Sequence, residues 1–263
     1  MNTSDASSLS DTKIFTIFST SVNLLLSLPI NSYIAWLIAT GSGGTLEAEL
    51  LPLNLAVFEI LFCLLSIVRF LKMIFTSVDL LSHFAKAFLW SGRPVFQCCI
   101  CVEQFLAVVH PVLFLRYKPL RYKVALSVLA WVAIIGLSLF YTFLYSIYYL
   151  CYVGECVVLI LVMLFCYFSV LVALKRPGPG RGGKGRGSTV KGRAFLTILV
   201  ITVSFLGTYF FWCVIIISSL NSWSSHDRKL LTRISTTLTF ASGFIQPLLH
   251  LRKAGKLWCL KGN

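Results

Sequence analysis

The stretch ECVVLILVMLFCYFSVLVAL, residues 155–174, decides the fold class of this chain. After its first residue it contains no charged side chain, and it matches the length of about 20 apolar residues that a transmembrane helix needs. The whole chain of 263 residues has the same character, since 57% of it is hydrophobic and only 12% charged, with a mean hydropathy of +0.86. Soluble domains carry about 25% charged residues. The composition therefore excludes a soluble globular enzyme and a disordered chain, and it indicates a multi-pass membrane protein.

Apolar spans of this kind recur along the chain. They are expected to cross the membrane as helices, because a helix satisfies its own backbone polar groups in lipid. The predicted fold is all-α, a seven-transmembrane helix bundle over residues 14–251, preceded by an extracellular segment (1–13) and followed by a cytoplasmic tail (252–263). The seven expected spans are residues 14–39, 51–73, 80–110, 123–147, 155–174, 194–220 and 230–251.

The basic residues predict the orientation of the chain. Fifteen of the 23 Lys and Arg residues follow the third span, follow the fifth span or lie in the tail. Such segments stay in the cytoplasm, so the N-terminus is expected outside the plasma membrane, where Asn2 begins a glycosylation triplet. Residues 175–193 form a basic Gly- and Pro-rich loop, expected to be flexible, cytoplasmic and attracted to anionic membrane lipid. The net charge of +14 therefore points to lipid and not to nucleic acid.

Several stretches resemble, in their order along the chain, motifs of the rhodopsin-like G-protein-coupled receptors. Each stretch departs from the family pattern at one or more positions, and together they cover nearly the whole chain. The sequence is thus identified as a divergent member of that family. The matching stretches are LPIN (28–31), LNLAVFE (53–59), CVEQFLAVVHP (101–111), Trp131 and QPLLH (246–250), followed by residues 251–260, which resemble the short amphipathic eighth helix.

The resemblance implies a function without enzymatic chemistry or a cofactor: a receptor that passes an extracellular ligand signal to a heterotrimeric G protein. Glu103, Gln104 and Phe105 match the motif that faces the G protein, with Gln104 in place of its arginine. Cys259 matches a palmitoylation position. The sequence has no HExxH zinc motif, nucleophile elbow or complete phosphate loop. Two alternatives stay open, a non-signalling decoy or dimer partner, which Gln104 favours, and a small membrane transporter.

Two charged residues inside apolar spans are candidate functional residues, because ionisable side chains are costly within a membrane. Counting about 1.5 Å per residue along a helix, Glu59 and Arg93 both fall near mid-membrane. We expect them to form an ion pair, since either charge alone would be expensive to bury; the alternative is that backbone or water satisfies each one. The resemblance implies that Glu59 matches an acidic residue that binds sodium, which Arg93 would replace. The intramembrane polar network is expected to include Asn31, Ser242 and Gln246.

Three bases near the outer ends of the third and seventh spans suggest a class of ligand. The register of the resemblance implies that Lys86 faces the ligand cavity, and Lys229 and Arg233 stand at the start of the seventh span. With Tyr209 offering aromatic surface, these residues predict an anionic extracellular ligand. The alternative is that the bases extend to lipid headgroups.

The nine cysteines do not predict a disulfide framework, since most lie inside apolar spans and are expected to behave as small hydrophobic residues. Cys151 and Cys156 are the two that are expected outside the membrane. The resemblance puts Asp79 where the family has a cysteine, so these two would bridge each other across a tight four-residue turn or stay free. We favour the local bridge.

Overall fold

The structure, a computed structural model, describes residues 3–41, 46–71, 79–117, 119–143, 148–175, 186–220 and 225–253. This part of the chain folds into helices and contains no strand, which confirms the all-α prediction. Its helices are α1 (Thr3–Ala39), α2 (Leu46–Leu71), α3 (Asp79–Val109), α4 (Pro111–Tyr117), α5 (Leu120–Phe143), α6 (Tyr148–Lys175), α7 (Arg186–Leu220) and α8 (Ser225–Lys253).

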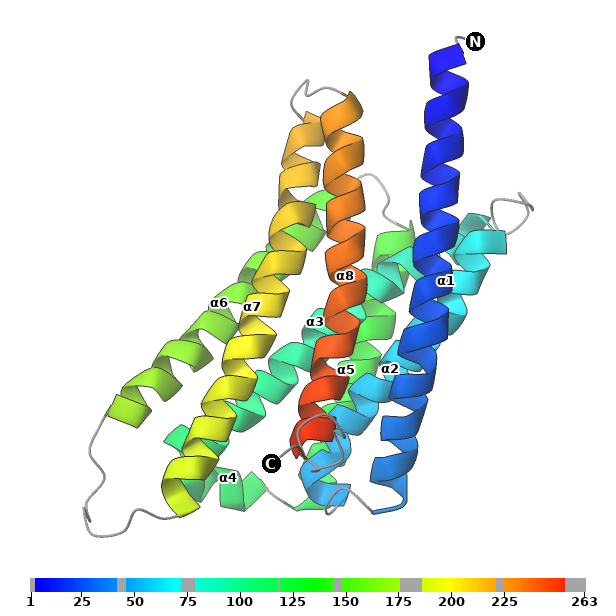
Figure 1. Cartoon of the computed structure of the whole chain (residues 1–263). Helices are drawn as coiled ribbons and strands as arrows, with labels where there is room; N and C mark the ends of the chain where they lie inside the picture. Colours follow the sequence, from blue (N-terminus) through cyan, green and yellow to red (C-terminus); the bar gives the residue numbers. More distant parts are fainter. Residues whose placement is uncertain are drawn as a thin grey trace, which may run out of the picture.

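Consecutive long helices run in opposite directions and surround α3 (Figure 1). In this view α1 begins at the upper end of the bundle, and α8 finishes at the lower end, which also carries α4. The oblique helix α3 packs against α2, α5, α6 and α7, while α1 packs against both α2 and α8. Side chains on α3 can therefore meet several other helices.

Six helices are, over their described residues, long and apolar enough to cross a membrane. This supports a multi-pass membrane protein. The seventh long helix, α8, packs against α7 and α1 but is less apolar, because it carries seven Ser and Thr residues among several charged ones. The six apolar stretches are Ile17–Ala39, Glu49–Ile67, Leu80–Val109, Leu120–Phe143, Cys151–Ala173 and Phe195–Ile215.

Two helix boundaries at the lower end have local causes. Gly41 follows α1 with a positive φ of 70°, and its N–H donates to the Ile38 carbonyl at 3.0 Å. A glycine in this left-handed conformation is a common helix stop because it has no Cβ. At the end of α3, Pro111 lacks a backbone N–H and disfavours a helical residue before it, so α3 ends at Val109 and α4 begins at Pro111.

Some predicted boundaries differ from the observed ones. The backbone of residues 3–13 continues α1 upward, and α7 begins at Arg186, so residues 186–193 of the expected loop are helical. The sequence pattern of residues 111–122 predicted only a connection, because seven residues are too few to show a helical period. Asn2, residues 176–185 and residues 254–263, including Cys259, lie outside the described residues.

The core between α2, α3 and α5 is aromatic. Phe58 stacks on Phe88 with ring centroids 5.1 Å apart, and Trp131 lies edge-on to Phe96, also at 5.1 Å. Gly92 on α3 permits this packing, because a Cβ at that position would lie 2.0 Å from the Phe58 ring. The contact holds α2 closely against α3 in the turn that carries the candidate site.

Candidate functional site

Glu59 on α2 and Arg93 on α3 form a buried ion pair with two hydrogen bonds. Arg93 Nε donates to Glu59 Oε1 at 2.6 Å, and Arg93 Nη2 donates to Glu59 Oε2 at 2.7 Å. Both side chains are only 3% exposed. Glu59 lies ten residues into the apolar stretch Glu49–Ile67 and Arg93 thirteen residues into Leu80–Val109, so both are near the middle of their helices. The ion pair predicted from the sequence is thus confirmed as a contact.

A second set of contacts ties this pair to α8. Arg93 Nη1 donates to Ser242 Oγ at 2.9 Å and also to the backbone carbonyl of Thr239. The Ser242 hydroxyl donates to the same carbonyl at 2.8 Å. One guanidinium, with its fixed fork of donors, therefore connects α2, α3 and α8. The sequence predicted Ser242 but missed Thr239, because a backbone carbonyl acceptor is not encoded by residue type.

The surroundings of the pair are closely packed. The Arg93 guanidinium carbon lies 5.0 Å from the centre of the Phe62 ring, within cation–π range. On the α8 side the pair faces Gly243, where a Cβ would lie 3.2 Å from Arg93 Nη2 and 3.3 Å from Glu59 Oε2. Glycine at this position therefore leaves room for the ion pair against the α8 backbone.

The other expected members of the network do not join it through described contacts. Asn31 is buried on α1, and its amide donates to the backbone and hydroxyl oxygens of Ser27 at 2.9 and 3.1 Å. The backbone of Gln246 belongs to α8, and its side chain lies outside the described part. A second amide on α1, Asn23, donates to Cys63 Sγ at 3.6 Å. A polar face of α1 therefore packs against α2 beside the ion pair.

The Glu59–Arg93 pair and its contact with Ser242 link three helices, and we call this arrangement the clamp. Both carboxylate oxygens of Glu59 accept from Arg93, so a cation that approached Glu59 would have to displace the guanidinium. Within the described ranges, no three His, Cys, Asp or Glu side chains are grouped so that they could hold a metal ion. The site can hold three helices in one arrangement, and it would resist any movement that separates them.

A second ion pair lies at the lower end of the bundle. Lys123 Nζ on α5 donates to Glu103 Oε1 on α3. Phe105 packs edge-on against His110 with ring centroids 5.6 Å apart. Gln104, between Glu103 and Phe105 in the sequence, is half-buried. Lys123, the first residue of the expected span 123–147, is buried one turn inside α5. The expected G-protein-facing residues do lie at the end of α3 next to α4.

Two residues from the stretches that resemble receptor motifs meet between α2 and α5. Trp131 Nε1 donates to Asn54 Oδ1 at 2.7 Å, and Asn54 Nδ2 donates to Ser127 Oγ at 3.1 Å and to the Leu50 carbonyl at 2.8 Å. The Asn54 amide thereby has partners for both its oxygen and its nitrogen. This contact fixes α5 against α2.

The residues expected to bind a ligand occupy different surroundings. Lys86 is half-buried on α3, and Tyr209 is buried on α7, where its ring stacks on Phe205 at 4.2 Å. Arg233 lies on α8 with its guanidinium carbon 5.7 Å from the centre of the Phe15 ring on α1. The described contacts thus link Tyr209 to the core and Arg233 to α1.

The rotation of α8 about its own axis explains why Arg233 lies away from Tyr209 on α7. Trp212 on α7 donates from Nε1 to Thr239 Oγ1 at 3.3 Å, which marks the face of α8 that meets α7. Arg233 precedes Thr239 by six residues, which is about 120° around a helix of 3.6 residues per turn. The side chain of Lys229 lies outside the described part. No described contact therefore gathers the predicted ligand-binding residues into one site.

The predicted bridge between Cys151 and Cys156 is wrong in this structure, where both cysteines are free. The prediction assumed a turn between them, but both belong to the continuous helix α6. Five residues of helix separate two Cα atoms by about 8–9 Å and turn them about 140° apart. A disulfide needs Cα atoms within about 7 Å, so the helix forbids this bridge.

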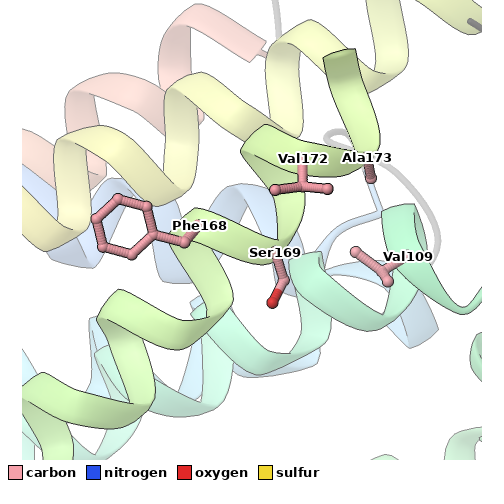
Figure 2. Close-up of a pocket in the computed structure, with 5 residues that line it drawn as sticks. All are labelled: Val109, Phe168, Ser169, Val172 and Ala173. Atoms are coloured by element: carbon pink, nitrogen blue, oxygen red, sulfur yellow. The ribbon is translucent and has the colours of Figure 1, made fainter. Parts of the chain in front are cut away.

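A shallow hollow, which no sequence pattern indicated, opens between the lower ends of α3 and α6. Figure 2 shows Val109 of α3 on one side of the hollow and four residues of α6 on the other. Of the lining side chains only that of Ser169 is polar, and the lining residues are Val109, Phe168, Ser169, Val172 and Ala173.

Comparison of the chain with known protein families finds no match, and comparison with curated proteins finds none.

Proposed function

We propose that this chain is a rhodopsin-like, seven-helix receptor that transmits an extracellular ligand signal across the plasma membrane. The alternating directions of the seven long helices described support this proposal, with α8 as the seventh crossing. Its N-terminus is extracellular, and the lower end with α4 and the basic α6–α7 connection is cytoplasmic. The excess of Lys and Arg on that side supports this orientation.

One observation carries the proposal: residues from separate motif-like stretches turn inward and pair with polar partners on other helices. Asn54 meets Trp131 across α2 and α5. Glu59 meets Arg93, which also reaches Ser242 on α8. Unrelated apolar helices would have no reason to place their few polar residues at matching depths, since each unpaired group would be costly in lipid.

In the proposed mechanism a ligand at the extracellular end shifts the helices that the Glu59–Arg93 clamp connects. We infer an anionic ligand from the positive charge of Lys86, Lys229 and Arg233 near the extracellular ends of α3 and α8, and not from a pocket that these residues form together. Movement of α3 relative to its neighbours would change the cytoplasmic surface around Gln104, where a heterotrimeric G protein would bind. The receptor performs no chemistry.

A non-signalling receptor-like protein, acting as a decoy or dimer partner, is the second candidate. The specific observation that favours it is Gln104, which offers no cation to a G protein where the resembling family has arginine. Arg93 adds support, because it fastens three helices together in the membrane core.

Basal activation of a panel of G proteins in cells, compared with Gln104→Arg at equal surface expression, separates the two candidates. We expect Gln104→Arg to raise basal activation, because arginine supplies a long, fixed cation. Gln104→Met is the matched control, since it changes the same side chain at similar length without adding a cation, and it should not raise basal activation. No activation by either the native chain or Gln104→Arg would overturn the signalling proposal and leave the second candidate.

A further inference from the structure

Helix α4 exposes apolar side chains at the lower end of the bundle (Figure 1). Its half-buried residue is Phe114, whose ring centre lies 5.7 Å from Lys123 Nζ on α5. The other six residues of α4 are exposed, and among them Val112 is 81% and Leu115 64% exposed. A contiguous apolar patch of this kind marks a surface that meets lipid or another molecule.

The position of α4 matches the headgroup level of a membrane. The apolar stretch of α3 ends at Val109, and that of α5 begins at Leu120. Because α4 joins these two limits, it lies where the hydrocarbon gives way to headgroups. Apolar side chains at this level can enter the edge of the hydrocarbon, while charged side chains stay among the headgroups.

Two exposed arginines accompany the apolar residues. Arg116 belongs to α4, and Arg121 lies in the first turn of α5. The guanidinium carbon of Arg121 lies 4.8 Å from the centre of the Tyr122 ring, which packs edge-on against Tyr117 with ring centroids 5.3 Å apart. Since Tyr117 follows Arg116 directly, both arginines belong to one exposed cluster of bases and tyrosines.

The charge of this cluster favours an anionic partner. Residues 104–154 contain no Asp or Glu, and the nearest acidic residue in the sequence, Glu103, is paired with Lys123. Among the described residues, neither Arg116 nor Arg121 is paired with a carboxylate. The planar guanidinium of arginine matches the oxygens of a phosphate group. An anionic, phosphate-bearing amphiphile therefore complements both the charge and the apolar face.

We propose that α4 and the first turn of α5 form a docking surface for an anionic phospholipid of the cytoplasmic leaflet. Arg116 and Arg121 bind the headgroup phosphates, Tyr117 and Tyr122 lie at the headgroup level, and the apolar side chains of α4 enter the acyl boundary. The inference rests on the proposed orientation, because anionic lipid is concentrated in the cytoplasmic leaflet.

The bound lipid would hold the end of α3 in place. Lys123 lies two residues after Arg121, and it pairs with Glu103, the residue before Gln104. Phe114 of α4 lies over the same Lys123. A headgroup bound across α4 and α5 would therefore fix the ion pair that stands next to the expected G-protein-facing residues.

The test is lipid binding by the full chain, purified in detergent and followed by native mass spectrometry. The probe is dioctanoyl phosphatidylinositol bisphosphate, a soluble lipid with several phosphates, and dioctanoyl phosphatidylcholine is the neutral reference. We expect the native chain to bind the anionic lipid in preference to the neutral one. Arg116→Gln/Arg121→Gln should weaken the tightest binding step about 25-fold, since each base near an anionic lipid contributes about 5-fold.

Arg181→Gln/Lys184→Gln is the matched control, because it removes two bases from the connection between α6 and α7 and leaves α4 unchanged. We expect this control to keep the tightest binding step of the native chain. Both double variants should also keep the native unfolding midpoint, since Arg116 and Arg121 are exposed.

Unchanged lipid binding in Arg116→Gln/Arg121→Gln would overturn the proposal, and so would an equal loss in the control, which would indicate a response to net charge alone. If lipid binding is unchanged while the variant loses G-protein activation in nanodiscs of phosphatidylcholine, the surface belongs to a protein partner instead. The purified chain needs neither ligand nor G protein to bind lipid, so failure of the receptor proposal would leave this result standing. An N-terminal epitope detected only in permeabilised cells would refute the orientation and overturn the assignment to the cytoplasmic leaflet.

Discussion

Arg93 donates to both carboxylate oxygens of Glu59, at 2.6 and 2.7 Å, from one helix to the next in the middle of an apolar bundle. The same guanidinium reaches Ser242 on a third helix. Burial makes each partner dependent on the other, because a lone charge in this environment lacks both water and counter-charge. The pair thus couples α2, α3 and α8.

Neutralising one partner should destabilise the bundle much more than neutralising both. Glu59→Gln or Arg93→Gln alone should each cost about 3–5 kcal/mol, because the remaining charge stays buried without a partner. The double variant should recover much of this loss, since two amides can hydrogen-bond to each other. Thermal unfolding in detergent, monitored for all four proteins, gives the coupling free energy. The control is Tyr141→Phe, which removes a hydrogen bond to Glu155. Its loss of unfolding free energy and that of Glu59→Gln should be additive to within about 0.5 kcal/mol.

Stability of the native chain should not depend on sodium. Arg93 already occupies both oxygens of Glu59, so a sodium ion finds no free carboxylate there. We expect the unfolding midpoint to stay the same when sodium chloride is replaced by choline chloride. Arg93→Ala should acquire a sodium-dependent rise in midpoint, since it leaves a buried carboxylate that needs a cation. A clear sodium effect on the native chain would contradict the prediction.

Gly243 should be intolerant of a side chain. In Gly243→Ala the new Cβ would lie 3.2 Å from Arg93 Nη2 and 3.3 Å from Glu59 Oε2, so the pair would have to shift. Overpacking of this kind costs about 1–3 kcal/mol. Gly136→Ala is the matched control, because a Cβ there has no heavy atom within 4 Å; it should be neutral or stabilise α5 by up to about 1 kcal/mol. Equal unfolding midpoints for the two variants would exclude a steric role for Gly243.

The sequence could predict the features that depend on composition and on the energetic cost of burying a charge. Long apolar stretches predicted the helices, and two opposite charges at similar depth predicted the Glu59–Arg93 contact. The clamp on α8 was predicted only in part, because the Thr239 carbonyl that accepts from Arg93 has no signature in the residue sequence.

Contacts that depend on the rotation of one helix against another were not predictable. Trp212 on α7 meets Thr239 on α8 only because of how the two helices are rotated about their own axes, and a sequence does not give that rotation. Helix α5 begins at Leu120, three residues before the expected span, so Lys123 lies one turn inside the helix and is the buried partner of Glu103. Errors of a few residues in a helix boundary therefore change the chemistry assigned to a side chain.

The bond between Trp131 and Asn54 should stabilise the contact of α5 with α2. Trp131→Phe keeps an aromatic ring against Phe96 but removes the indole N–H, which leaves Asn54 Oδ1 without its donor at a partly buried position. A buried polar group that loses its partner typically costs about 1–3 kcal/mol. Trp36→Phe is the control, because Trp36 is 58% exposed on α1, and it should change the free energy of unfolding by less than about 0.5 kcal/mol. Adding Asn54→Ala to Trp131→Phe should cost less than Asn54→Ala in the native background, since the hydrogen bond is already lost. Strictly additive losses in thermal unfolding would mean that the indole and the amide do not interact.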